Sequence, residues 1–405
     1  MSSACWTAPR RASAAASDLA RTGARTGDDV ADGGEAASRA VREDRIARLR
    51  LIRTPTVGPV TYGQLLARYG SAEAAVAAVP DLARRGGGRP PVLPTRSTIE
   101  YEVATVERVG ARYLFLGLPG YPAALAEIQT APPVLIVRGR RALLDRPALA
   151  MVGARNASAS ACRFARGLAS ELGAQDVSVV SGLARGIDTA AHQGSLDHGT
   201  IAVIAGGIDV VYPPENAELQ EDIATRGLLI AEQPPGTEPR ARHFPYRNRI
   251  IAGLAQAVLV VEAAPKSGSL ITARHAGEFG REVLAVPSSP LDPRAQGCNL
   301  LIREGATLIQ TADDVLEALR PIDPRASLFE PSAGGYAGPP IAADADEGDR
   351  RTVMGLLGPS PVPVDEIVRQ SGRPPAIVQT VLLELELELG GRLERHAGGQ
   401  VSLAF

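Results

Sequence analysis

Short, uninterrupted apolar runs alternate with segments of helical periodicity through the middle of the chain, and this alternation constrains the fold more than any other feature. The runs occupy residues 148–152, 177–180, 201–204, 228–231 and 257–261. Runs of this length without alternating polar residues are typical of strands buried on both faces of a parallel sheet. The pattern predicts an α/β fold with a doubly wound, Rossmann-like, mostly parallel sheet.

A loop of small residues follows the run at 257–261 and opens the next predicted helix. It reads Lys266, Ser267, Gly268, Ser269, and Lys266 is the only lysine in the chain. The first amides of a helix are unpaired and lie at the positive end of its dipole, so this position suits a phosphate group. Serine and glycine are also common where a helix is simply capped, and the loop alone favours that ordinary role.

The segment just before this strand, RHFPYRNR from Arg242, favours binding. Arg247 and Arg249 are suited to backbone phosphates, and the ring of Phe244 offers a face on which a base can stack. Asn248 can donate and accept hydrogen bonds at once. The structural alternative is a solvated basic turn with one aromatic ring in the core. Because the turn leads directly into the strand, loop and helix, we favour a binding site.

Several of these segments are expected to meet at one edge of the sheet. Ligands of open α/β sheets bind outside the carboxyl ends of the strands. Arg155 follows the first predicted strand, the loop 181–188 follows the second, Gly206 and Gly207 follow the third, and the loop 266–269 follows a later one. This convergence is the strongest inference that the residues themselves provide.

Composition and missing motifs narrow the function further. The formal net charge is −2, so a DNA site must be a local patch. The 3 cysteines and 5 histidines lack metal-ligand spacing, and no apolar run approaches the roughly 18 residues of a membrane helix. Neither G-x-G-x-x-G nor G-x-x-x-x-G-K-[ST] occurs. We expect no metal, no cofactor and no membrane segment, and a cytoplasmic location. Asp188 and His192, four residues apart on one helix face, are expected to pair rather than to perform acid–base chemistry.

A series of motifs in the core has a familiar order. The chain carries SGLARGIDTAAH, AGGIDVVYPPEN, RNRIIAGL, VVEA, SGSLITA, GREVLAVP and GCNLLIREGA between residue 150 and about residue 309. In this order and spacing they resemble the DNA-processing protein A family, also called DprA or Smf. The resemblance implies a protein that is not an enzyme and that binds and protects single-stranded DNA. It also implies help in loading the RecA recombinase during natural transformation and homologous recombination, and a homodimer formed through the Rossmann-like domain.

The resemblance and the residue chemistry together define one expected DNA site. Backbone phosphates are expected at the side chains of Arg155, Arg247, Arg249 and Lys266 and at the amides of 267–269. A base is expected to stack on Phe244. The chain departs from the family pattern in three nearby places. It has VGAR where the family usually has VGSR, Pro287-Ser288-Ser289 where the family has Pro-Gly, and GCN where the family usually has GTN. The expected site residues are Arg155, Ser181, Arg185, Gly186, Phe244, Arg247, Asn248, Arg249, Lys266, Ser267, Ser269 and Asn299.

Composition shifts divide the chain into five parts. We expect a disordered extension at 1–42, a small helical domain of helix-hairpin-helix or SAM-like type at 43–115, a Rossmann-like DNA-binding domain at 116–320, a linker at 321–348 and a winged-helix-like domain at 349–405. In the helical domain, the turn at 56–60 suits a phosphate on its amides, and a purely structural packing role is at least as consistent with it.

The last of these domains has an acidic third helix. Three predicted helices and a hairpin are typical of a winged helix, whose third helix often contacts DNA. Here that helix carries Glu384, Glu386 and Glu388. Their charges oppose close approach to phosphates. We therefore expect a protein-interaction or packing module.

A competing interpretation is a nucleotide phosphoribohydrolase of the LOG type, which has a similar α/β architecture. Glu262 and Arg274 are the residues that would act on a nucleoside monophosphate. The PGGxGT pattern of that group is absent, and the basic aromatic turn would have no role in it. The binding interpretation is favoured.

Overall fold

The structure is a computed structural model that describes residues 27–85, 89–320, 345–387, 393–396 and 398–403, with side chains from Arg39 onward. Two compact units divide between Arg45 and Ile46. Helix α1 (Gly27–Ile52) begins well inside the expected disordered extension, so that expectation is wrong for residues 27–42. Residues 1–26, and most of the expected linker at 321–348, lie outside the described residues.

A small helical domain precedes the sheet, as predicted. It contains α2 (Pro59–Tyr69), α3 (Ala72–Arg85) and α4 (Arg96–Arg108). Pro59 stands in the first turn of α2, where a missing N–H costs no hydrogen bond, and Gly70 ends this helix with φ 72°. Leu51, Leu65 and Leu82 are buried together in its core.

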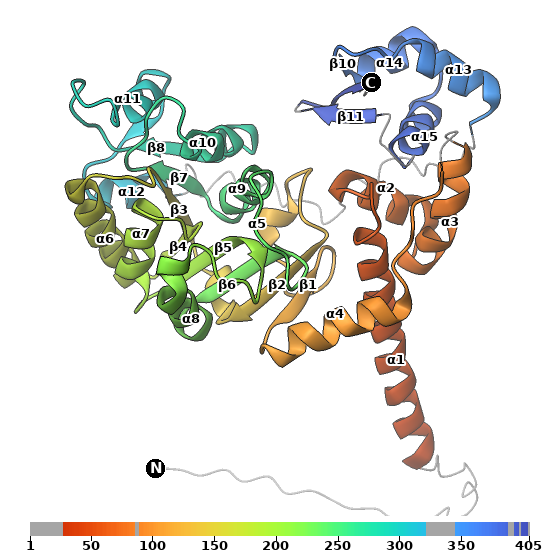
Figure 1. The fold of residues 1–405 in the computed structure, drawn as a ribbon, viewed down its shortest axis with the longest axis horizontal. Coiled ribbons are helices and arrows are strands. Elements are labelled where there is room, and N and C mark those ends of the chain that lie inside the picture. Colours follow the sequence, from red (N-terminus) through yellow and green to blue (C-terminus); the bar gives the residue numbers. More distant parts are fainter. Residues whose placement is uncertain (1–26, 86–88, 321–344, 388–392, 397, 404–405) are drawn as a thin grey trace, which may run out of the picture. The chain divides into compact units, whose positions relative to one another are not determined.

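The central sheet has nine strands and confirms the predicted α/β class. Six strands from β6 through β8, together with β9, run parallel, while β1 and β2 form an antiparallel extension beside β6 (Figure 1). Strand β2 begins at Val134, directly after two prolines, and no strand was predicted there. In spatial order the strands are β1 (Arg112–Phe115), β2 (Val134–Gly139), β6 (Leu228–Gln233), β5 (Thr200–Gly207), β4 (Ser178–Ser181), β3 (Ala148–Val152), β7 (Ala257–Val260), β8 (Glu282–Ala285) and β9 (Thr307–Leu308).

Helices cover both faces of this sheet because alternate side chains of each strand point to opposite sides. Ala150 of β3 belongs to the core under one layer of helices, while Leu149 and Met151 belong to the core under the other. The first layer contains α5 (Ala123–Ala126), α9 (His243–Leu254), α10 (Ser269–Glu278) and α11 (Gln296–Arg303). The second contains α6 (Ala159–Ala174), α7 (Ile187–Ser195), α8 (Ala217–Arg226) and α12 (Ala312–Ala318).

Strand order places a crevice beside β3. The chain runs from β3 outward through β4, β5 and β6, then returns to β7 on the other side of β3 and continues outward to β8 and β9. The reversal between β3 and β7 is a topological switch point, and ligands of such sheets bind there, outside the carboxyl ends of the strands.

The basic aromatic segment is a helix and not the expected turn. Its residues form the first half of α9, and Pro245 lies in the opening turn, where proline is tolerated. Ile250, Ile251 and Leu254 in the second half are buried in the sheet core. The proline and the cluster of polar residues conceal this helix in the sequence, whereas its buried apolar half anchors it.

The C-terminal domain has the predicted winged-helix elements. These are α13 (Glu347–Gly355), β10 (Val362–Pro363), α14 (Val364–Ser371), α15 (Pro375–Glu386), β11 (Leu393–His396) and β12 (Gln400–Leu403), with strand order β10-β12-β11. The acidic surface expected on α15 is wrong for Glu384, which is 1% exposed and pairs with Arg350 at 2.8 Å. Glu386 pairs with Arg395 at 2.9 Å, and Glu388 lies outside the described residues.

None of the described helices is both long and apolar enough to cross a membrane.

Candidate nucleic-acid interface

Two adjoining cavities open at the carboxyl ends of the central strands. The smaller, of about 410 Å³, lies over β4 and β5, and the larger, of about 740 Å³, lies over β3 and the loop after β7. Both are lined by Arg155, Asn156, Ala184, Phe244 and Arg247. The predicted convergence at this edge of the sheet is therefore present in the structure.

Arg247 is the buried cation at the junction of the two cavities. Its side chain is 6% exposed, and a Cβ added to Gly182 would overlap its guanidinium group. Among the described residues it has no hydrogen-bond or ion-pair partner, and its Nε is enclosed without an acceptor. Burial lowers the pKa of Arg247 to about 10, the charge of Asp188 opposes this effect, and the charge of Arg155 adds to it. A buried cation of this kind favours an incoming anion.

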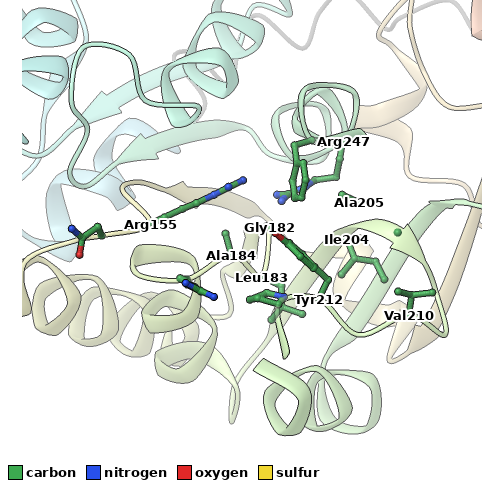
Figure 2. Close-up of a pocket in the computed structure, with 14 residues that line it drawn as sticks. Arg155, Gly182, Leu183, Ala184, Ile204, Ala205, Val210, Tyr212 and Arg247 are labelled. Carbon is green, nitrogen blue, oxygen red and sulfur yellow. The ribbon is translucent and has the colours of Figure 1, made fainter. Parts of the chain in front are cut away.

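Arg155 approaches Arg247 from the loop after β3. Figure 2 shows the two guanidinium ends pointing toward one another across the cavity. Like charges that converge in this way repel each other, and an anion held between them would relieve the repulsion. The structure therefore brings two of the predicted phosphate-binding residues to one point.

An aromatic wall stands beside these two cations. The guanidinium carbon of Arg155 lies 5.0 Å from the centre of the Phe244 ring, and the Tyr212 ring lies 5.7 Å from the Phe244 ring. Phe244 is half-buried, whereas Tyr212 is 46% exposed. Tyr212 was not among the predicted site residues, although it belongs to the motif AGGIDVVYPPEN. Together the two rings offer a surface on which a base can stack.

The loop after β4 forms part of the wall of the smaller cavity, but its backbone amides donate hydrogen bonds to buried side chains of the protein. Asp188 accepts hydrogen bonds from the amides of Gly182 at 3.2 Å and Ala184 at 3.3 Å. His192 Nε2 accepts from the amide of Leu183 at 3.3 Å, while its Nδ1 faces Thr200 Oγ1 at 2.7 Å. The expectation that Asp188 and His192 pair with each other is therefore wrong, because each of them holds this loop.

Three predicted residues of the same loop have different roles. Ser181 is fully buried and donates to the carbonyl of Met151 at 2.6 Å, so it is a structural residue and not a ligand contact. Gly186 has φ 77°, and a side chain there would collide with the carbonyl oxygen of Ala154. Arg185 is exposed at the rim of the smaller cavity and forms an ion pair with Glu215.

The loop before α10 lines the larger cavity as predicted, but two of the three amides at 267–269 are occupied. The amide of Ser267 donates to Ala264 at 2.9 Å, and that of Ser269 makes a long bond of 3.4 Å to Ser267 Oγ. Within the described part of the chain, the amides of Lys266 and Gly268 have no hydrogen-bond partner. Asn248 donates to the carbonyl of Gly268 at 3.3 Å and so ties α9 to this loop. Lys266 is exposed and lines the same cavity.

Two of the predicted DNA contacts, Arg249 and Asn299, lie outside both cavities. Arg249 is buried in an ion pair with Glu232 at 2.5 Å and donates to the carbonyl of Thr130 at 2.6 Å. Asn299 binds the backbone of Ser288 twice, at 2.9 and 3.3 Å, and so shapes the loop after β8. The polar groups of both side chains are thus used within the protein.

Arg294 and Asn156 line the cavities but were not among the predicted site residues. Arg294 lines the larger cavity and pairs with Asp292 at 2.9 Å, and Asn156 lines both cavities. Asn156 directly follows Arg155 and could have been included on that ground. Arg294 has no comparable signal, because only the folded loop brings it near the switch point.

The residues proposed for hydrolase chemistry do not form such a site. Glu262 accepts from the amide of Ser158 at 3.0 Å and from its hydroxyl at 2.7 Å, so its carboxylate caps α6. Arg274 is exposed on α10 and lines neither cavity. Within the described ranges, no group of His, Cys, Asp and Glu side chains is arranged to hold a metal ion.

Comparison with known proteins finds matches to all three folded domains. Residues 112–320 match the family described as DNA recombination-mediator protein A. Residues 42–105 match a DprA-like N-terminal HHH domain, and residues 337–399 match a DprA winged helix domain.

Individual relatives show the same similarity. Protein Smf of Escherichia coli K12 is 36% identical over 317 residues, which cover 76% of this chain and 82% of that protein. Protein Smf of a Synechocystis strain is 45% identical over 210 residues, and this match spans 50% of this chain but only 52% of the relative. The crystal structure of DNA processing protein A from Streptococcus pneumoniae aligns with a TM-score of 0.55 and 37% identity, covering 64% of this chain and 92% of that one.

Proposed function

The chain belongs to the DNA recombination-mediator protein A family, and from this premise we propose that its two adjoining cavities bind single-stranded DNA. The observation that carries the proposal is the buried guanidinium of Arg247, which has no acceptor among the described residues and faces Arg155. A backbone phosphate between the two arginines supplies the missing negative charge.

A single strand suits the site better than a duplex does. Cations at Arg155, Arg247 and Lys266 line the cavities together with the aromatic ring of Phe244. Proteins that bind single strands combine a basic groove with aromatic faces, because unpaired bases can leave the stack and lie on a ring. In a duplex the base faces are already covered by neighbouring base pairs, so only the phosphates would be within reach.

The partners of this activity are part of the proposal. A recombination mediator transfers a bound strand, and we place this chain before the RecA recombinase as the protein that protects incoming DNA and helps to load RecA on it. A homodimer formed through the Rossmann-like domain would hold one strand at two sites. Sedimentation at increasing concentration tests the dimer, and RecA filament assembly on a single strand, with and without the chain, tests the loading.

Equilibrium binding tests the central proposal. Fluorescein-labelled oligo-dT should bind the wild-type chain more tightly than a duplex of the same length does. Arg247→Ala should weaken oligo-dT binding at least tenfold, because the variant loses a charge-assisted contact to phosphate of about 1.5–3 kcal/mol. The matched control is Arg226→Ala, which removes an exposed arginine at the C-terminal end of α8. Because β6 begins two residues later, Arg226 lies at the opposite edge of the sheet from the two cavities. Equal affinity of wild type and Arg247→Ala would refute the proposed site.

The same protein separates binding from hydrolysis. Incubation with nucleoside monophosphates should release no free base, because Glu262 is occupied in capping α6. Release of base by the wild-type chain would instead favour the hydrolase interpretation.

A further inference from the structure

A carboxylate lines the cavity that is proposed to bind an anion. Asp188 is among the residues of the larger cavity, and it is 6% exposed. A negative charge at this position repels phosphate and by itself weakens binding. Its presence therefore requires a contribution to the site other than direct contact with DNA.

The backbone beside Asp188 is strained. Leu183 has φ 55°, in the left-handed region that residues other than glycine rarely adopt. Its side chain is fully buried with Ile204 and Ile208, so the residue cannot rotate outward. A strained residue of this kind persists only when its surroundings hold it in place.

Buried polar side chains hold this strained loop from below. Asp188 accepts from the amides on both sides of Leu183, His192 accepts from the amide of Leu183 itself, and Asn216 donates to its carbonyl at 3.0 Å. All three side chains are buried. Hydrogen bonds to a buried carboxylate are stronger than neutral ones, so Asp188 contributes most to holding the loop.

The held loop in turn supports Arg247. The guanidinium lies directly against Gly182, where even one added carbon would overlap it. A small movement of the loop therefore displaces the guanidinium or lets it rotate. The nearby charge of Asp188 also attracts Arg247, although no ion pair between them is found in the described residues, so the donors of Arg247 stay available.

We propose that Asp188 is a positioning residue, which acts with His192 to hold the strained loop 182–184 and thereby aims the Arg247 guanidinium at the ligand phosphate. This inference rests on the proposed DNA-binding function. This role explains why an acidic side chain lies in an anion site. A displaced Arg247 guanidinium would lower the affinity for phosphate more than repulsion by the Asp188 charge does.

The sign of one substitution tests the inference. Asp188→Asn keeps the size of the side chain and removes a negative charge, so simple electrostatics predicts tighter binding of oligo-dT. The positioning role predicts the opposite, a loss of at least fivefold together with a shallower dependence on salt. Asp222→Asn is the matched control, because it removes an exposed carboxylate on α8 and should change little.

A double-mutant cycle completes the test. If Asp188 acts through Arg247, the variant Asp188→Asn/Arg247→Ala should bind no more weakly than Arg247→Ala alone. Unchanged or tighter binding by Asp188→Asn, or two losses that multiply in the double variant, would overturn the inference. His192→Gln provides a second variant, expected to lose affinity in the same non-additive way, if Asp188→Asn fails to fold.

Hydrogen exchange distinguishes this inference from the proposed function. Amides 182–184 should exchange faster in Asp188→Asn than in wild type, while the amides of β3 and β7 stay protected. If wild type fails to bind oligo-dT, the proposed function is wrong, and the positioning role toward DNA is lost with it. If wild type binds but these amides and the affinity are unchanged in Asp188→Asn, only the positioning inference is wrong.

Discussion

The guanidinium of Arg155 lies over the ring of Phe244, with 5.0 Å between its central carbon and the ring centre. This contact joins the loop after β3 to the first turn of α9, on either side of the switch point. It restrains Arg155 without using its hydrogen-bond donors, because a cation–π contact engages the face of the ring. The donors of Arg155 are thus left available for a ligand.

Phe244→Ala should weaken binding to oligo-dT by about 1–3 kcal/mol, because a stacking face is lost and Arg155 is released. Phe244→Tyr should bind like wild type, since it keeps the ring. Fluorescence anisotropy with labelled oligo-dT measures both. Tyr101→Ala, which removes an exposed ring from α4, is the control and should have no effect. Full affinity in Phe244→Ala would contradict a stacking role.

Arg249→Ala should destabilise the protein rather than change its ligand contacts. The variant leaves Glu232, which is 20% exposed, without its cation, and loss of one partner of a buried pair costs about 3 kcal/mol. Denaturant unfolding should show this loss, whereas the folded variant should bind oligo-dT with the wild-type salt dependence. A shallower salt dependence with unchanged stability would mean that Arg249 contacts DNA after all.

Protonation of His192 should destabilise the fold at acidic pH. Burial lowers the pKa of His192 from its ordinary 6.5 to about 3, so between these values the unfolded chain binds a proton that the folded chain does not. The contribution of His192 to the free energy of unfolding should fall by about 1.4 kcal/mol per pH unit as the pH drops below 6.5.

The neighbouring carboxyl has the opposite pH dependence. Burial raises the pKa of Asp188, so its contribution to stability grows as the pH falls through the interval above its ordinary 3.8.

The difference in unfolding free energy between wild type and His192→Gln isolates the contribution of the histidine from that of Asp188. A difference that does not change between pH 7 and pH 4 would contradict the neutral, buried His192.

Gly186→Ala should destabilise the protein by at least about 1–3 kcal/mol, because φ 77° is strained for alanine and the methyl group would collide with Ala154. Gly277→Ala is the matched control. It lies in α10 with open space around it, and alanine should stabilise that helix by up to about 1 kcal/mol. Thermal unfolding of the two variants should therefore shift in opposite directions, and a shift of both in the same direction would contradict this local geometry.

Much of the fold could be predicted because buried parallel strands have a simple sequence pattern. Ala148–Val152 is a continuous apolar run and is β3. Helix α9 was missed because Pro245 and two arginines obscure its apolar side, and only packing against the sheet reveals Ile250 and Ile251 as its core face. Strand β2 was missed because prolines precede it.

The site was predictable where residue type determines the role, and not where the role depends on a partner distant in sequence. Arg155, Phe244 and Arg247 meet because Arg155 follows β3, while Phe244 and Arg247 lie at the start of α9, the helix that leads to β7. Arg249 has the same residue type as Arg247, but two positions along a helix turn it by about 200°, toward Glu232. The sequence pattern alone does not show that Glu232 lies beside Arg249 and forms an ion pair with it.

The salt dependence of oligo-dT binding tests the central claim most directly, because it reports how many phosphates the protein neutralises. The logarithm of the association constant should fall linearly with the logarithm of salt concentration, and Arg247→Ala should reduce the slope by about 0.7, the value for one phosphate of a single strand. Arg226→Ala should keep the wild-type slope. An unchanged slope in Arg247→Ala would contradict the assignment of this buried arginine to a DNA phosphate.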